Sequence, residues 1–141
     1  MVSPASARIP LAMLDAIVAQ ARVEYPLEAC GLIAGSGYAA DGGSALRYMA
    51  CRNAAASPTR YAVHPDDLYR ITVETDDADE VLWGIVHSHV RSPAVPSLTD
   101  IGLAQYPDAL YLLVSLAEEP PALRGWRIVD GAIHEVKLEV A

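Results

Sequence analysis

Apolar positions along the chain alternate between a helical spacing and short continuous runs, which predicts helices interleaved with buried strands. Over residues 10–24 the apolar side chains recur every three or four positions, as in an amphipathic helix. The apolar runs at 29–34, 46–51 and 81–87 are too short for buried helices and predict strands. A second helix is expected over 64–75, because proline and acidic residues at 65–67 suit a first helical turn.

The last third of the chain predicts a short helix followed by strands. We expect the helix at residues 97–105 and the strands at 109–116, 123–129 and 132–139. Asp130 and Gly131, between the last two strands, are typical of a two-residue hairpin turn. No internal repeat and no long linker interrupts the pattern. The sequence therefore predicts one α+β domain over residues 1–141, with a mixed β-sheet flanked by helices.

Charge and hydropathy narrow the classes of partner. The chain has 10 basic and 18 acidic residues and therefore a net charge of −8. This charge argues against nucleic acid as a ligand. No apolar stretch approaches the roughly 20 residues of a membrane span. The N-terminal residues lack a basic head followed by an apolar run, so we expect a cytoplasmic protein with no membrane partner. An apolar content of 52% is compatible with a homodimer.

The two cysteines, Cys30 and Cys51, lie far apart in the sequence and form no C-x-x-C motif. We expect both to be buried, reduced thiols. A disulfide or a thiol ligand stays open as the alternative. Trp83 and Trp126 are expected in the core, His64 at a helix start and His134 in a structural position.

Candidate chemistry is concentrated in residues 87–100, which contain His87, His89, Ser97 and Asp100. On a strand, His87 and His89 face the same side while the serine between them points away. Two imidazoles and one carboxylate make the three-ligand set of a catalytic zinc site. Each part has a structural alternative: the histidines can fill space, and Ser97 with Asp100 fits a helix capping box.

A hydrolytic metal site also needs a general base, and the candidate is Glu28. This residue comes directly before the first apolar strand and is flanked by residues that resemble core positions. An ordinary surface glutamate at a helix–strand junction is the alternative. Arg60 and Tyr61 either line a substrate cleft or serve solvation and packing.

Glu28, His87-Ser88-His89, Ser97 and Asp100, with the spacing they have here, resemble the JAMM (MPN+) metalloprotease signature. The similarity extends over about residues 9–135 to the bacterial members that process sulfur-carrier proteins. It includes Asn53, Tyr61 and the segments 57–59, 77–80 and 128–131. One departure is Val90, where many members have proline after the second histidine.

The resemblance implies an MPN-type fold and a role for each residue of the signature. His87, His89 and Asp100 would bind one Zn²⁺. Glu28 would take a proton from the attacking water and pass it to the leaving amine. Ser97 would donate a hydrogen bond to the developing oxyanion.

The implied partner is the C-terminal tail of a small ubiquitin-like sulfur-carrier protein, from which cysteine is released. Two alternatives stay open. One is an isopeptidase that removes such a carrier from lysine or from a fused protein. The other is a non-catalytic binding module with the same fold.

Overall fold

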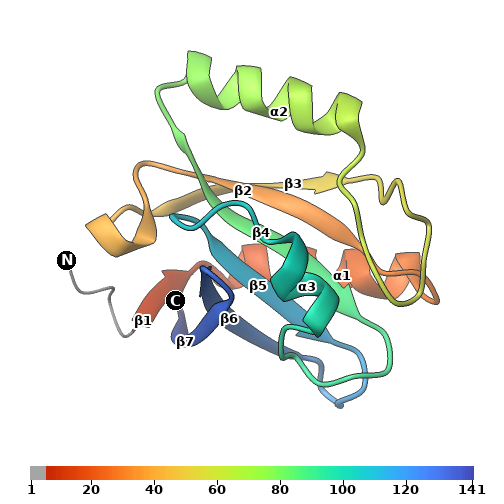
Figure 1. Ribbon diagram of the computed structural model, residues 1–141. Coiled ribbons are helices and arrows are strands. Elements are labelled where there is room, and N and C mark those ends of the chain that lie inside the picture. The colour runs from red at the N-terminus through yellow and green to blue at the C-terminus, as the bar shows by residue number, and fades with distance from the viewer. Residues whose placement is uncertain (1–5) are drawn as a thin grey trace.

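A mixed sheet runs through the molecule, and helices cover both of its faces (Figure 1). The computed structural model describes residues 6–141; residues 1–5, on which part of the expectation about the N-terminus rests, lie outside it. The seven strands follow the order β1-β7-β6-β5-β4-β2-β3. The β1–β7 and β4–β5 pairs are parallel and the others antiparallel, which confirms the predicted mixed sheet. The strands are β1 (Ser6–Ile9), β2 (Cys30–Gly35), β3 (Ala45–Cys51), β4 (Val81–His89), β5 (Leu110–Ser115), β6 (Ala122–Val129) and β7 (Ala132–Val140).

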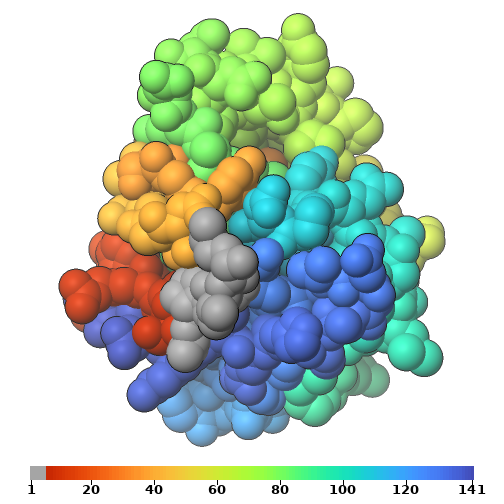
Figure 2. Space-filling view, turned by 60° about the vertical axis from the view of Figure 1, so that its left-hand side comes forward, coloured from red at the N-terminus to blue at the C-terminus, as the bar shows by residue number. Residues whose placement is uncertain are grey.

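The helices lie on different faces of the sheet. Helix α1 (Leu11–Glu24) contributes Met13, Ile17 and Ala21 to one core, whereas Ile71 of α2 (Pro65–Asp77) belongs to the other. The short helix α3 (Leu98–Leu103) lies on the same face as α2. Alternate residues of β5 point into each core, so the two cores lie on opposite sides of the sheet. Figure 2 shows α2 (green) as the upper end of the molecule, above the segment that includes β2 (orange).

The structure differs from the sequence prediction mainly at element ends and at one strand. Strand β1 was not predicted, because four residues are too few for a periodic pattern and the strand pairs with β7 at the other end of the chain. Pro10, expected in the first turn of α1, precedes the helix in an extended conformation. Strand β4 extends to His89, helix α3 ends at Leu103 instead of residue 105, and a 3₁₀ turn (Ala39–Asp41) lies between β2 and β3.

A β-bulge in β4 decides which of its side chains point to each face of the sheet. Gly84 pairs with Ile33 and Leu82 with Ala34, so Trp83 between them has no partner on β2. The extra residue resets the alternation of the strand. Trp83 therefore enters the core beside α1, while Ile85 and the histidines beyond it face the side of α2 and α3.

Several other structural expectations agree with the structure. His64 caps the start of α2, whereas His134 is exposed on β7. Cys30 and Cys51 are buried free thiols, directly opposite each other on β2 and β3. Both tryptophans are buried. Asp130 and Gly131 have positive φ angles and connect β6 to β7, as expected for the hairpin turn. Within residues 6–141, no helix is both long and apolar enough to cross a membrane.

Asp67 attaches helix α2 to the end of β3. Its carboxylate accepts hydrogen bonds from the backbone N–H, Nε and Nη2 of Arg52, at 2.9, 3.1 and 3.0 Å. Hydrogen bonds from Arg52 lower the pKa of Asp67 from 3.8 to about 2. Because the folded state holds the carboxylate ionised, this contribution to stability is complete above about pH 4 and is lost as the pH falls toward 2.

We therefore expect Asp67→Asn to lower the free energy of unfolding at pH 7 by roughly 1–3 kcal/mol, the range for a hydrogen-bonded charged group. The neighbouring Asp66, whose side chain is 83% exposed, provides the control Asp66→Asn. Urea unfolding at pH 7 and pH 2.5 measures both variants. An Asp67→Asn variant as stable as Asp66→Asn at pH 7 would contradict the role of this carboxylate.

Candidate metal centre

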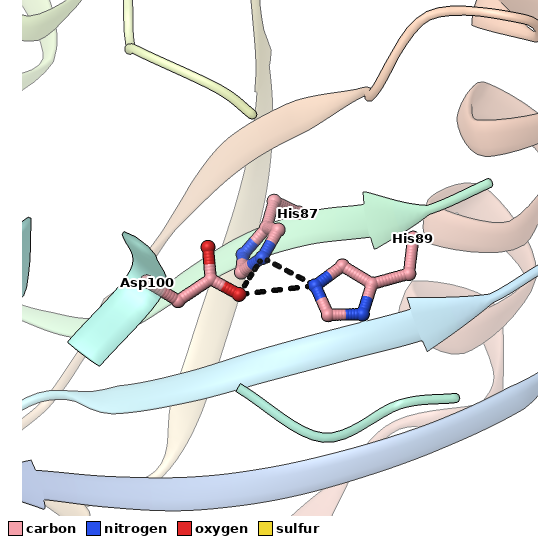
Figure 3. A group of neighbouring side chains, drawn as sticks. All are labelled: His87, His89 and Asp100. Atoms are coloured by element: carbon pink, nitrogen blue, oxygen red, sulfur yellow. Dashed lines mark hydrogen bonds and ion pairs between the residues drawn. The ribbon is translucent and has the colours of Figure 1, made fainter. Parts of the chain in front are cut away.

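The end of β4 brings two imidazoles to one point. His87 and His89 lie two residues apart on the strand, on the same face, and their Nε2 atoms are 3.2 Å apart (Figure 3). Ser88, between them, points away from the pair and accepts a hydrogen bond from the Ala29 N–H at 2.7 Å. Both histidines are buried, with exposed fractions of 1% and 3%. The strand alternation predicted from the sequence is present here.

Asp100 completes the cluster from the start of α3. Its Oδ2 lies 3.1 Å from His87 Nε2 and 3.0 Å from His89 Nε2. The same oxygen accepts a hydrogen bond from the Ser97 N–H, and the Ser97 hydroxyl accepts one from the Asp100 N–H, which together form a capping box. The two readings of Ser97 and Asp100 are therefore compatible, since one carboxylate can cap the helix and face both histidines.

The hydrogen-bonding pattern of this cluster is compatible with a bound metal ion. His89 Nδ1 lies 2.7 Å from the carbonyl oxygen of Pro93, which fixes the proton on Nδ1 and leaves a lone pair on Nε2. That lone pair faces Asp100 Oδ2, also an acceptor, so a proton or a metal ion must lie between them. His87, His89 and Asp100 are the ligand types found in catalytic zinc sites, and their ligand atoms all lie within 4.8 Å of one another.

The pKa shifts agree with this description. Burial lowers the pKa of His87. Burial also opposes charge on His89, but hydrogen bonding to Asp100 outweighs it and raises the pKa of His89. For Asp100, burial raises the pKa, while hydrogen bonds with both histidines bring it well below its usual range. The carboxylate is therefore ionised and available as a ligand.

Tyr61 packs against the face of His87. The two rings are stacked, with centroids 4.2 Å apart and an angle of 19° between their planes. Within residues 6–141, His87 Nδ1 has no hydrogen-bond partner, so ring stacking and the contact of Nε2 with Asp100 hold this imidazole in place. Of the two roles weighed for Tyr61, packing is present, and the residue also lines a cavity with Arg60 and Asp100.

Glu28 is buried beside the cluster, not on the surface. Only 4% of the residue is exposed, and its Oε1 has no hydrogen-bond partner within residues 6–141. Burial raises the pKa of the carboxyl group to about 7, while the charges of His89 and Asp100 act in opposite directions. A pKa near neutral suits a group that both accepts and donates protons.

Backbone contacts hold Glu28 in place. Its N–H donates to the carbonyl oxygen of Ser57 at 2.9 Å, and its carbonyl accepts from Asn53 Nδ2 at 3.0 Å. The Asn53 side chain also accepts from the N–H groups of Ala55 and Ala62, which organises the loop that contains Tyr61. Asn53 was noted in the sequence only through resemblance. An asparagine outside any helix or strand is the local signal for such a side chain that bridges backbone groups.

Two separate hollows flank the cluster. One, of about 490 Å³, is lined by Glu28, His89 and Ser97. The other, of about 240 Å³, is lined by Asp100 together with Tyr61 and Arg60. The structure thus brings all five residues singled out in the sequence to one place, with a hollow on either side of the cluster.

Three consecutive carbonyls fix the loop between β4 and α3. Ser92 accepts from the Ser115 hydroxyl at 2.6 Å, Pro93 faces His89 Nδ1, and Ala94 accepts from Trp126 Nε1 at 2.9 Å. The three donors come from β5, β4 and β6. These contacts were not predicted from the sequence, because nothing in the strands that contain Ser115 and Trp126 indicates a hydrogen bond to a distant loop.

Comparison with known proteins supports the fold and identifies the family. Residues 10–129 match the Prok-JAB family, described as prokaryotic homologs of the JAB domain. A CysO-cysteine peptidase of Mycobacterium tuberculosis is 41% identical over 130 residues, covering 91% of this chain and 86% of that protein. A desampylase of Haloferax volcanii is 32% identical over 117 residues, covering 78% and 82%.

Solved structures have the same architecture. A solution structure from Desulfitobacterium hafniense superimposes with a TM-score of 0.83 at 27% identity, covering 95% of this chain and 92% of that one. A JAB1/MPN domain protein of Archaeoglobus fulgidus shares the fold, with a TM-score of 0.62 at 20% identity, covering 96% and 98%. By its match over most of its length and by its similarity to these relatives, the chain belongs to the Prok-JAB family of JAB-domain proteins.

Proposed function

We propose that the protein is a zinc-dependent peptidase that hydrolyses the amide bond at the C-terminus of a small ubiquitin-like sulfur carrier and releases cysteine. The observation that supports the proposal is the convergence of His87, His89 and Asp100 next to Glu28, a buried carboxyl group with one oxygen that has no partner among residues 6–141. The relative named CysO-cysteine peptidase, at 41% identity, supports the choice of substrate.

The residues present fit a zinc ion. Two imidazole Nε2 atoms and one carboxylate oxygen face each other with no donor hydrogen that could satisfy all three. His87, His89 and Asp100 would hold the ion, with the Pro93 carbonyl orienting His89. When bound, zinc polarises a carbonyl and lowers the pKa of water, which is the chemistry that amide hydrolysis needs.

Glu28 and Ser97 would supply the proton transfers and the hydrogen bond to the oxyanion. Both line the hollow beside His89, so both have access to a bound amide. Glu28 would accept a proton from the attacking water and deliver it to the leaving nitrogen. The Ser97 hydroxyl accepts from the Asp100 N–H, which leaves its own hydrogen free to donate to the developing oxyanion.

Intact-mass measurement of a purified carrier–cysteine adduct, incubated with the zinc-loaded protein, tests this function. We expect the adduct to lose the mass of one cysteine residue. If the adduct is unchanged while a lysine-linked or fused carrier is cleaved, the isopeptidase function replaces the proposed one. If no carrier is cleaved and the purified protein contains no zinc, a non-catalytic module is the better description.

The contacts of the loop between β4 and α3 predict that replacing Trp126 weakens zinc binding and that replacing Trp83 does not. Trp126→Phe removes the N–H that fixes Ala94, so we expect Zn²⁺ binding to weaken about 2- to 10-fold, as for the loss of one hydrogen bond. Trp83→Phe is the matched control, because Trp83 is also buried but donates to Gly43, in a different loop. Chelator competition measures both affinities. Equal affinities in the two variants would show that the Ala94 contact does not support the site.

A further inference from the structure

Arg91 places a cation without a partner beside the proposed catalytic residues. Its side chain forms no hydrogen bond or ion pair with any residue from 6 to 141, although it lines the same hollow as Glu28, His89 and Ser97. Most of the other arginines form ion pairs. Acidic side chains pair with Arg22, Arg47, Arg52, Arg70 and Arg124. The Arg91 guanidinium is therefore available for a ligand in this hollow.

The backbone at Arg91 is fixed on both sides. Val90 before it is buried, and the carbonyls of Ser92 and Pro93 after it face Ser115 and His89. The exposed side chain therefore extends from an anchored point two residues beyond His89. An anchored cation loses less conformational freedom when it binds a ligand than one on a mobile loop.

The proposed reaction supplies a ligand for this cation. A residue released from a C-terminus has a free α-carboxylate, which is separated from the scissile nitrogen by one carbon atom. With a net charge of −8, the protein as a whole repels such a group, so a local cation is needed to bind it. Arginine binds carboxylates through two parallel N–H···O bonds, which fixes orientation as well as charge.

The position of Glu28 indicates which hollow receives the leaving residue. Glu28 would donate a proton to the leaving nitrogen, so that nitrogen must lie on the side of Glu28. The hollow on this side includes Arg91, whereas Arg60 lines the other hollow, with Asp100. The two hollows share no lining residue.

We propose that Arg91 binds the free α-carboxylate of the residue that is released and so makes the enzyme selective for a C-terminal amino acid over an isopeptide-linked group. This assignment rests on the proposed function and adds a determinant of its specificity. It is a binding role, distinct from the proton transfers of Glu28.

Two substrates that differ only at the leaving carboxylate test the role of Arg91. The first is the carrier–cysteine adduct described above, and the second is the same adduct with a C-terminal carboxamide. We expect wild type to prefer the carboxylate, and Arg91→Gln to lower kcat/KM for it about 10- to 100-fold, the range for a hydrogen bond to a charged group. Cleavage of the carboxamide should change less than about 3-fold, and Arg91→Lys should restore part of the loss.

Arg60→Gln is the matched control, because Arg60 is also exposed and lines the opposite hollow. We expect this variant to keep the wild-type preference for the carboxylate. If wild type cleaves both substrates equally, or Arg91→Gln slows both equally, the role of Arg91 is wrong while the peptidase function stands. If zinc-loaded wild type cleaves neither substrate, the proposed function fails and this role fails with it.

Discussion

Glu28→Gln is expected to abolish amide hydrolysis while leaving the fold and the zinc content unchanged. The amide has nearly the same shape as the carboxyl group but cannot accept a proton from water or return one to the leaving nitrogen. General acid–base catalysis by one group typically contributes 100- to 10,000-fold. Because Glu28 would both accept the proton from water and donate it to the leaving nitrogen, we expect a loss of at least about 1,000-fold in kcat.

The surroundings of Glu28 allow the loss of catalysis to be distinguished from a loss of structure. Among the residues that the structure describes, one carboxyl oxygen of Glu28 has no partner, so replacing Glu28 with glutamine breaks no hydrogen bond of that atom. Turnover of the carrier–cysteine adduct, zinc content and thermal unfolding are the measurements. Glu24→Gln, at an exposed position four residues earlier, is the control and should behave like wild type. Activity within about 10-fold of wild type would exclude Glu28 as the base.

Asp100→Ala has the second large expected effect, on metal binding. The substitution removes a proposed ligand oxygen and leaves two neutral imidazoles to hold the ion. Loss of an outer-sphere partner already costs about 10- to 100-fold in metal affinity. Loss of a direct ligand should exceed that, so we expect zinc affinity to fall by more than about 100-fold.

Asp100 also caps α3, so its two contributions must be separated. Ser97→Ala removes the hydroxyl that accepts from the Asp100 N–H but retains the carboxylate. Both variants should lose roughly 1 kcal/mol of unfolding free energy with the cap. Asp100→Ala loses in addition the contacts of the carboxylate with both histidines. Only Asp100→Ala should lose zinc. Equal zinc content in the two variants, measured after dialysis, would mean that Asp100 only caps its helix.

The sequence predicted the cluster well because its geometry depends on local rules. Alternation on one strand brings His87 and His89 together, and a capping box starts a helix at Ser97. Neither feature requires knowledge of distant contacts. The α+β class and the hairpin at Asp130 follow from equally local patterns.

The features that were not predicted depend on distant contacts. Strict alternation backward from His87 would put Trp83 on the same face, and only the bulge opposite β2 moves it to the other core. The burial of Glu28 depends on its contacts with Asn53 and Ser57, in a loop that the sequence shows only as irregular. Strand β1 exists because β7 provides an edge for it. No local pattern encodes such pairings.

The separation of the two indoles into different cores has an optical consequence. Trp83 lies in the core beside α1, whereas Trp126 lies in the core beside α2 and donates to the loop that leads to Ser97. With one tryptophan replaced by phenylalanine, the tryptophan fluorescence comes from a single side of the sheet. The molecule thus contains two tryptophan reporters, one on the loop between β4 and α3 and one on the opposite half of the fold.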